Sequence, residues 1–252
     1  MLQSSGNSNR KEVKFYNYRL STDLSDIAID TETSRPKVVD CLNPHSFVTA
    51  LSDDDYRKAL ETCDYLVPDG EGICMAMKWV KGVKIHKIAG DDIHNHLLKK
   101  LNDINGKAFY FGSSEKVLRL IADRIHREYP AITVETLSPS YCEELSEEES
   151  QDAVKKIDSF NPDVLFVSMT APKQEKWIAC NIDHIKTPKL IAAIGGVFDF
   201  FAGTHKRAPE WAVRMKMEWL VRLLKEPRRM WKRNFVSTPK FMLYVFCHRK
   251  EI

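Results

Sequence analysis

The chain has 252 residues, of which 43% are hydrophobic, and a net charge of +3. This length fits one large α/β domain, or one domain with an appendage, that buries a substantial core. The first 14 residues, MLQSSGNSNRKEVK, are polar throughout, and no apolar run reaches the ~20 residues of a spanning helix, so the sequence predicts neither a secretion signal nor a transmembrane segment. The six cysteines include no C-x-x-C pair, which argues against a zinc knuckle or a disulfide framework and favours reduced thiols in a cytoplasmic protein.

Strand and helix patterns alternate along most of the chain. Residues 1–12 are expected to form a disordered tail. The early elements are predicted as strands at 13–20, 37–42 and 65–67 and as helices at 47–60 and 70–80. The later ones are strand 108–111, helix 115–129, strand 132–137, helix 146–160, strand 163–168, helix 173–182 and strand 189–194. Because the strands are continuous apolar runs between long helices, the pattern predicts a Rossmann-like α/β fold, with a largely parallel sheet and helices on both faces.

Two turns carry carboxylates at the ends of predicted elements. Asp69 follows a buried strand in the turn Pro68-Asp69-Gly70, and open α/β sheets bind ligands at the carboxyl ends of their strands. Asp69 could equally cap the helix that follows, so both interpretations stay open at this point. A second turn, at 89–92, places Asp91 just before the helical pattern 93–101.

Other acidic and histidine residues do not predict a metal site. The triplet Asp53-Asp54-Asp55 contains a D-x-D, which holds a metal in many sugar-nucleotide transferases, but it lies within the helical pattern 47–60. We therefore interpret it as a solvated helix face. His94 and His96 stand two residues apart and face different directions on a helix, so we do not interpret them as metal ligands.

The stretch IAAIGGVFDFFAGTHKRAP, residues 191–209, breaks a strand at Gly195-Gly196, where the backbone can turn sharply and approach a ligand. Asp199 follows within one turn. The aromatic residues Phe198, Phe200 and Phe201 suit a pocket wall, although an ordinary strand-to-loop junction is the simpler alternative. Neither G-x-G-x-x-G nor G-x-x-x-x-G-K-[ST] is present, which disfavours nicotinamide and P-loop chemistry.

The charge of the chain is uneven. Residues 204–252 carry 13 Lys and Arg against 4 Asp and Glu, a net charge of +9, whereas the remainder has a net charge of −6. Arginines alternate there with tryptophans at helical spacing, and such residues suit phosphate oxygens and the lipid headgroup boundary. The alternatives are a solvated basic face over a core-packing stripe, and nucleic-acid binding, for which no recognisable module is present.

Several long motifs resemble one known family. They are LNPHSF, DYLVPDGEGI, the GDD turn, APKQEKWI, IGGVFDFFAG, KRAPEW and MEWLVRLLKEPRR. In this order, over roughly residues 37–246, the chain resembles the WecG/TagA/CpsF family of bacterial glycosyltransferases. The resemblance implies transfer of a sugar from a UDP-sugar to a polyprenyl-diphosphate-linked acceptor in cell-surface polysaccharide biosynthesis. N-acetylmannosamine is the expected sugar and GlcNAc-diphosphoundecaprenol the expected acceptor.

The resemblance also implies roles for individual residues. Asp69 matches the aspartate of the family's P-D-G motif and would be the catalytic base of an inverting transfer. Cys41 and Asn43 match its T-x-N pair, so asparagine is kept, while cysteine, a poorer hydrogen-bond partner, replaces threonine. The residues implied to line the donor pocket are Asp91, Gln174, Gly195, Gly196 and Asp199. The arginines implied to contact the diphosphate of acceptor or donor are Arg207, Arg214, Arg222 and Arg228.

The implied enzyme needs no metal and no other cofactor, so arginine charge would stabilise the leaving diphosphate. Residues 13–203 would form the transferase core, and residues 204–252 a basic helical appendage that binds the inner face of the cytoplasmic membrane peripherally. Members of the family can self-associate, so a homo-oligomer is a further expectation, and nucleic acid is not an expected partner. The alternatives are N-acetylmannosaminuronic acid or glucose as the sugar, or a non-catalytic protein that binds anionic lipid or nucleic acid.

Overall fold

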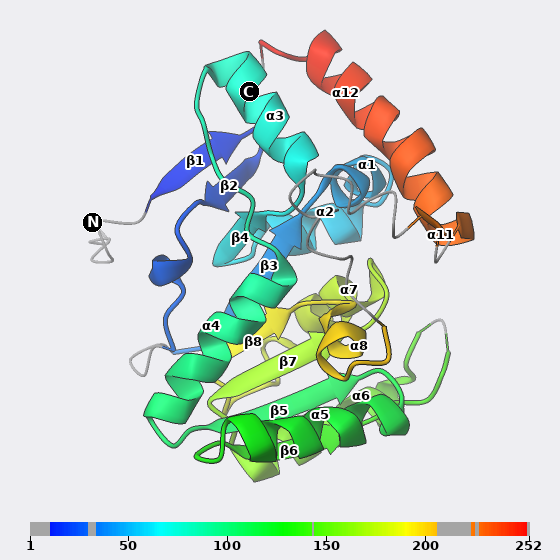
Figure 1. Cartoon of the computed structure of the whole chain (residues 1–252). Helices are drawn as coiled ribbons and strands as arrows, with labels where there is room; N and C mark the ends of the chain where they lie inside the picture. Colours follow the sequence, from blue (N-terminus) through cyan, green and yellow to red (C-terminus); the bar gives the residue numbers. More distant parts are fainter. Residues whose placement is uncertain (1–10, 30–33, 143, 206–222, 225–226, 251–252) are drawn as a thin grey trace, which may run out of the picture.

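The structure, a computed structural model, describes residues 11–29, 34–142, 144–205, 223–224 and 227–250 (Figure 1). These residues form an eight-stranded sheet in the order β1-β2-β4-β3-β8-β7-β5-β6. The strands are β1 Glu12–Phe15, β2 Tyr18–Ser21, β3 Lys37–Leu42, β4 Tyr65–Pro68, β5 Lys107–Gly112, β6 Thr133–Leu137, β7 Val164–Ser168 and β8 Leu190–Ala193. Neighbouring strands are parallel except β1 and β2, which form an antiparallel hairpin at one edge. The predicted Rossmann-like α/β fold is confirmed.

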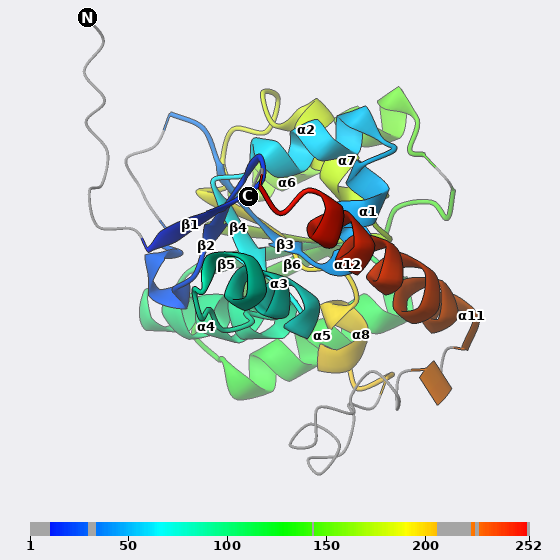
Figure 2. The same ribbon diagram turned by 90° about the horizontal axis from the view of Figure 1, so that it is seen from above.

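Helices cover both faces of this sheet (Figure 2). They are α1 Pro44–Ala50, α2 Asp54–Glu61, α3 Glu71–Lys81, α4 Gly90–Asp103, α5 Glu115–Glu128, α6 Glu147–Phe160, α7 Lys173–Asn181, α8 Val197–Phe201, α11 Pro227–Trp231 and α12 Thr238–Cys247, with a 3-10 turn at Leu24–Asp26 and a π-helical segment, η2, at Lys232–Ser237. In β5, Ala108 and Tyr110 pack with α4, α5 and α8, whereas Phe109 and Phe111 pack with α6 and α7. Because successive strand residues point to opposite faces, a strand covered on both sides must be apolar at every position.

A further apolar cluster joins the two ends of the chain. Phe15 of β1, Phe47 of α1 and Phe241 of α12 are buried together, and the rings of Phe47 and Phe241 lie 5.2 Å apart. Both views show α12 lying beside α1 and α3 (Figures 1 and 2). The expected appendage, residues 204–252, therefore shares a hydrophobic core with the expected transferase core through α12. Where a domain boundary falls stays a prediction.

The predicted single helix over 47–60 is wrong, because the chain forms two helices, α1 and α2, with a break between them. Asp53 is the N-cap of α2, and its carboxylate accepts a hydrogen bond from the backbone N–H of Tyr56 at 3.1 Å. The same carboxylate pairs with Lys176 of α7 at 2.7 Å. An aspartate satisfies N–H groups at a helix start, which favours a new helix inside the acidic triplet over a continuous one. Asp53 is thus a helix start attached to α7, whereas Asp54 and Asp55 are exposed in the first turn of α2, so the predicted solvated face is confirmed for these two residues only.

Two other predicted elements differ from the sequence-based expectation. The predicted strand 13–20 is the β1–β2 hairpin, which begins at Glu12, and residues 1–10 of the expected tail lie outside the described residues. The predicted helix 93–101 already begins at Gly90, so the acidic turn before it is the first turn of α4. Among the described residues, no helix is both long enough and apolar enough to cross a membrane.

Candidate active site

The carboxyl ends of β4, β3, β8 and β7 stand side by side, and the turns that follow carry most of the predicted site residues. Asp69 follows β4, Asn43 follows β3, and Gly195-Gly196 follows β8. In the sheet, β4 lies on one side of β3, whereas β8, β7, β5 and β6 lie on the other. The strand order therefore changes direction between β3 and β8, and open α/β sheets bind ligands at such a switch point. Because these four strands are parallel, the turns that follow them share one edge of the sheet, and neighbouring strands lie only about 4.8 Å apart.

Asp69 does not cap α3, because the N-cap of that helix is Gly70. Gly70 has a φ of +89°, a conformation that favours glycine. The backbone N–H of Asp69 donates to the carbonyl of Leu42 at 2.8 Å, which fixes the end of β4 against the end of β3. Its side chain is half-buried at this edge. The capping alternative is therefore wrong, while the role of Asp69 as a base stays a prediction.

Cys41 and Asn43 lie at the end of β3, next to this turn. Burial raises the pKa of the Cys41 thiol, and the nearby Asp69 carboxylate raises it further, so the thiol is neutral. The side-chain oxygen of Asn43 caps α1 by accepting the backbone N–H groups of His45 and Ser46, each at 3.0 Å. The cap uses only the oxygen, so the donor groups of the Asn43 amide are not involved in it.

Close packing between glycines and their neighbours brings the remaining turns to the same edge. A Cβ on Gly72 of α3 would lie 2.5 Å from Cγ of Pro44, and a Cβ on Gly90 would lie 3.2 Å from the carbonyl oxygen of Ile194. Asp91, the next residue, therefore lies beside the end of β8, and its carboxylate accepts a hydrogen bond from the Asn95 amide at 3.1 Å. The predicted site residues at 43, 69, 91 and 195 are thus brought together.

The side chain of Gln174 holds the Gly195-Gly196 turn by a hydrogen bond. Its side chain is buried, and its carbonyl oxygen accepts the backbone N–H of Gly195 at 3.2 Å and that of Met169 at 3.3 Å. Gly195 has a φ of +52°, and its own carbonyl accepts a hydrogen bond from the hydroxyl of Ser168. The amide oxygen of Gln174 therefore holds the protein backbone, and a contact with substrate stays a prediction.

The residues after Gly196 form α8, and this corrects part of the expected pocket wall. Phe198 and Phe201 are buried in the core beside α4 and α5, whereas Phe200 is half-buried. On a helix, residues three apart share a face, so two of the three aromatic residues turn inward. The carboxylate of Asp199 accepts a hydrogen bond from the hydroxyl of Thr204 at 3.2 Å.

The basic candidates lie largely outside the description. Arg207, Arg214 and Arg222 fall outside the described residues. The backbone of Arg228 lies in α11, and its side chain is outside the described part of the chain. Their expected contacts with diphosphate stay predictions.

The described residues contain no group of three or more His, Cys, Asp or Glu side chains arranged to hold a metal ion. His94 is buried, its Nε2 lies 2.7 Å from the Tyr110 hydroxyl, and burial lowers its pKa to about 3. It is a neutral core histidine, whereas His96 contacts the carbonyl of Ile27. The two residues thus face different surroundings, as their spacing predicts.

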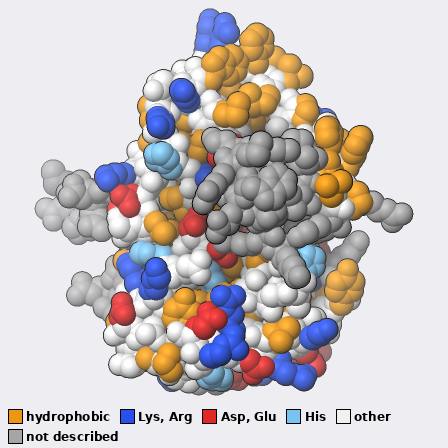
Figure 3. All heavy atoms as spheres, in the orientation of Figure 1, with side chains coloured by type: hydrophobic (Ala, Val, Ile, Leu, Met, Phe, Trp, Pro, Cys, Tyr) orange, Lys and Arg blue, Asp and Glu red, His pale blue; other side chains and the backbone are white. Residues whose placement is uncertain are grey.

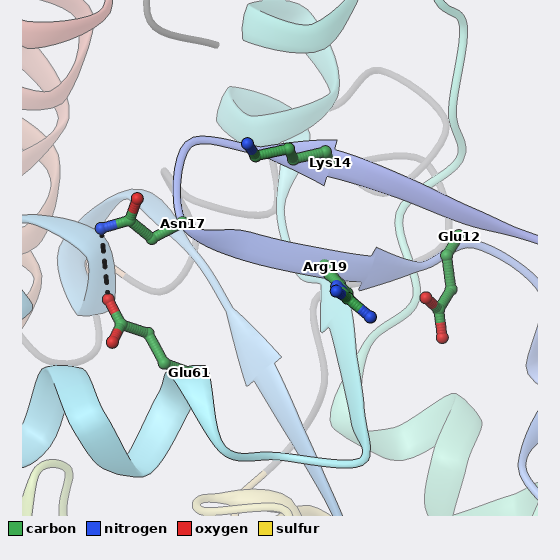
Figure 4. Close-up of a pocket in the computed structure, with 5 residues that line it drawn as sticks. All are labelled: Glu12, Lys14, Asn17, Arg19 and Glu61. Carbon is green, nitrogen blue, oxygen red and sulfur yellow. Dashed lines mark hydrogen bonds between the residues drawn. The ribbon is translucent and has the colours of Figure 1, made fainter. Parts of the chain in front are cut away.

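Two hollows can be described apart from this edge. An open one of about 530 Å³ lies at the β1–β2 hairpin, where Asn17 faces Glu61 of α2 at 3.4 Å (Figure 4). Its walls contain only exposed or half-buried polar side chains, and none is a predicted site residue. The second, of about 300 Å³, lies between β3, α2 and α7 and is lined in part by the buried carboxyls of Asp40 and Glu175.

Sequence reasoning missed four residues that shape this region. Ser168 and Glu175 support the glycine turn and Gln174, and the imidazole of His45 lies 2.8 Å from the hydroxyl of Ser237. A signal existed for Glu175 and for His45, which lie in the recognised motifs APKQEKWI and LNPHSF. The contacts of Ser168 with Gly195 and of His45 with Ser237 join segments far apart in the chain, so no local pattern predicts them.

Comparison with known proteins places the chain in a class of enzymes. Residues 12–251 match the model of the glycosyl transferase WecG/TagA/CpsF family, and the chain belongs to that family. It is therefore a glycosyltransferase.

Named relatives narrow the comparison. The chain is 33% identical over 214 residues to an N-acetylglucosaminyldiphosphoundecaprenol N-acetyl-beta-D-mannosaminyltransferase of Bacillus subtilis, covering 85% of this chain and 80% of the relative. Proteins of the same name from Bacillus spizizenii and Staphylococcus aureus are 31% and 29% identical, covering 82% and 83% of this chain and 78% and 80% of the relatives.

Proposed function

We propose that this enzyme transfers N-acetylmannosamine from a UDP-sugar to N-acetylglucosaminyl-diphosphoundecaprenol. The names of relatives that match more than four-fifths of the chain support this substrate pair. The observation that carries the proposal is the position of Asp69. Its half-buried carboxylate stands at the end of β4, beside the end of β3, on the edge that also bears the glycine turn and Asp91.

In the proposed reaction Asp69 is the general base. The carboxylate takes the proton from the attacking hydroxyl of the acceptor sugar, and that oxygen forms a bond to the anomeric carbon of the donor. The bond between this carbon and the UDP oxygen breaks, so the configuration inverts and UDP carries the negative charge away. A base next to the reacting hydroxyl contributes about 10²- to 10⁴-fold to such a step.

The leaving diphosphate needs positive charge. We assign this role to the arginines of residues 204–252, with Arg207, Arg214, Arg222 and Arg228 as the candidates, because guanidinium groups bind phosphate oxygens in pairs. The net charge of +9 in this segment supports the assignment. In this proposal arginine supplies the stabilisation without a metal ion.

The lipid-linked acceptor of the proposed reaction implies a membrane surface, and one face of the protein exposes hydrophobic side chains that could contact a membrane. Trp79 of α3 and Phe246 of α12 are 51% and 54% exposed, and their rings stack with centroids 5.8 Å apart. Leu243 is 64% exposed on the same helix. Figure 3 shows hydrophobic side chains gathered over α3 and α12. Aromatic residues beside basic ones bind well at the headgroup boundary, so we propose peripheral binding on the inner face of the cytoplasmic membrane.

A donor panel tests the proposed function. Purified protein is incubated with the lipid-linked acceptor and UDP-N-acetylmannosamine, its uronic acid, UDP-glucose or UDP-N-acetylglucosamine, and the lipid product is identified by mass spectrometry. The expected product gains one N-acetylmannosamine. A product from a different sugar would reassign the donor, and no UDP release with any of them would favour a non-catalytic binding protein.

A further inference from the structure

Two buried carboxyl groups, one on β3 and one on α7, line the same cavity and take no part in the proposed chemistry. Asp40 of β3 and Glu175 of α7 are only 3% and 5% exposed, and both line the cavity of about 300 Å³. One oxygen of Glu175, Oε2, is buried without a hydrogen-bond partner. Burial of a carboxyl group without a full set of hydrogen bonds costs free energy, so the presence of Glu175 here calls for a physical reason.

The other oxygen of Glu175 is connected to the predicted site by a short chain of hydrogen bonds. Oε1 accepts the side-chain N–H of Gln174 at 2.8 Å, and the Gln174 carbonyl oxygen accepts the N–H of Gly195. The donors fix the orientation of the amide. Its oxygen must face two backbone N–H groups, so its nitrogen must face the acid, which has an oxygen to accept it.

We infer that Glu175 is a positioning residue that, acting through Gln174, holds the Gly195-Gly196 turn in place at the donor site. The inference rests on the proposed function for the role of that turn in donor binding. Without an acceptor at position 175, the Gln174 amide can rotate, and Gly195 then loses the partner of its N–H. Gly195 is half-buried, and loss of the partner of its N–H destabilises the turn, which then samples other conformations.

The surroundings of Glu175 raise the pKa of its carboxyl group. Burial raises the pKa of Glu175 to about 7, and burial followed by the charge of Glu175 raises the pKa of Asp40. The other titratable or charged groups around them are Arg35, Cys41, Tyr56, Cys63, Lys176 and Asp183. Arg35 forms its ion pair with Asp64, and Lys176 pairs with Asp53, so the described residues give Glu175 no cationic partner. The neutral and charged forms both offer Oε1 as an acceptor, so the hydrogen bond to Gln174 persists across this titration.

The test compares Glu175→Gln with Glu175→Ala. Glutamine keeps an oxygen at the Oε1 position and so rescues the hydrogen bond, whereas alanine removes it. Amide hydrogen exchange at Gly195 and titration with UDP-N-acetylmannosamine are measured for both variants. We expect alanine to speed the exchange of Gly195 and to weaken donor binding, each at least tenfold, and glutamine to stay within about threefold of the parent protein. Asp183→Asn, which removes an exposed carboxyl at the same cavity and leaves Asp40, Gln174 and Glu175 in place, is the control.

Three outcomes decide the inference. If the alanine variant leaves the Gly195 exchange unchanged, or if glutamine and alanine weaken donor binding equally, Glu175 does not position the turn. Should the alanine variant fail to fold, Gln174→Met removes the same contact to Gly195 and must speed its exchange in the same way. If Glu175→Ala speeds the exchange of Gly195 but the parent protein transfers no sugar, the positioning role is supported and the proposed function is overturned. The positioning role and the proposed function can therefore fail separately.

Discussion

The carboxyl edge of the sheet and the cluster around α12 are held together in different ways. At the edge, the turns of three strands are fixed by backbone hydrogen bonds and by Gln174, and side chains such as that of Asp69 stay half-buried. Around α12, the aromatic rings of Phe15, Phe47 and Phe241 pack in a buried cluster. Substitutions at the edge should therefore change the chemistry with little loss of stability, and those in the cluster should do the reverse.

The largest expected effect is that of Asp69→Asn on turnover. Asparagine keeps the size of the side chain and removes its ability to take a proton, so we expect kcat to fall about 10²- to 10⁴-fold. UDP binding by calorimetry and the melting temperature should stay close to those of the parent. Turnover within fivefold of the parent would remove Asp69 from the role of base.

The opposite behaviour is expected for Phe241→Ala. Removal of this buried ring should lower the free energy of unfolding by about 3 to 5 kcal/mol, measured by urea denaturation. Leu243→Ala, two residues away but largely exposed, is the control and should change stability by less than about 0.5 kcal/mol. Equal effects of the two would show that α12 does not pack against α1 in solution.

The buried acids predict how stability depends on pH. Glu175 has a pKa raised from 4.5 to about 7 in the folded state, so the folded form binds more protons than the unfolded one in that interval. Stability is then fully present below pH 4.5 and falls as the pH rises towards 7, by up to about 3 kcal/mol. In Glu175→Gln this component is absent, and melting curves between pH 4.5 and 8 should be flatter than those of the parent. A parallel pair of curves would contradict the assignment.

The apolar face over α3 and α12 predicts weaker membrane binding when it is made polar. Replacing Trp79 and Phe246 together by serine should weaken binding to anionic vesicles roughly tenfold or more in a flotation assay, since each ring contributes about 1.5 to 3 kcal/mol when buried. Ile104→Ser, at an equally exposed position after α4, is the control. Unchanged vesicle binding by the double variant would contradict a membrane role for this face.

The smallest expected effect is that of chelation. If arginine charge stabilises the leaving diphosphate, addition of EDTA should leave the rate of sugar transfer within twofold of its original value. A large loss of rate that added Mg²⁺ or Mn²⁺ restores would replace the metal-free proposal.

The sequence by itself determined the class of fold and the family. Apolar runs between helical patterns predicted the parallel sheet, because a strand covered on both faces must be apolar throughout. Long motifs of local sequence predicted the family, and the turn before Gly70 placed Asp69 at a strand end. These features depend on residues close together in the chain, so they can be read from it directly.

The tertiary structure decided which side chains face the site and which support it. Gln174 turned inward because the N–H groups of Met169 and Gly195 meet it there, and Phe198 and Phe201 joined the core because α8 replaced the expected loop. The pairing of Phe241 with Phe47 likewise joins distant segments. Such contacts depend on how far-separated residues meet in space, which a local period or turn signal does not encode.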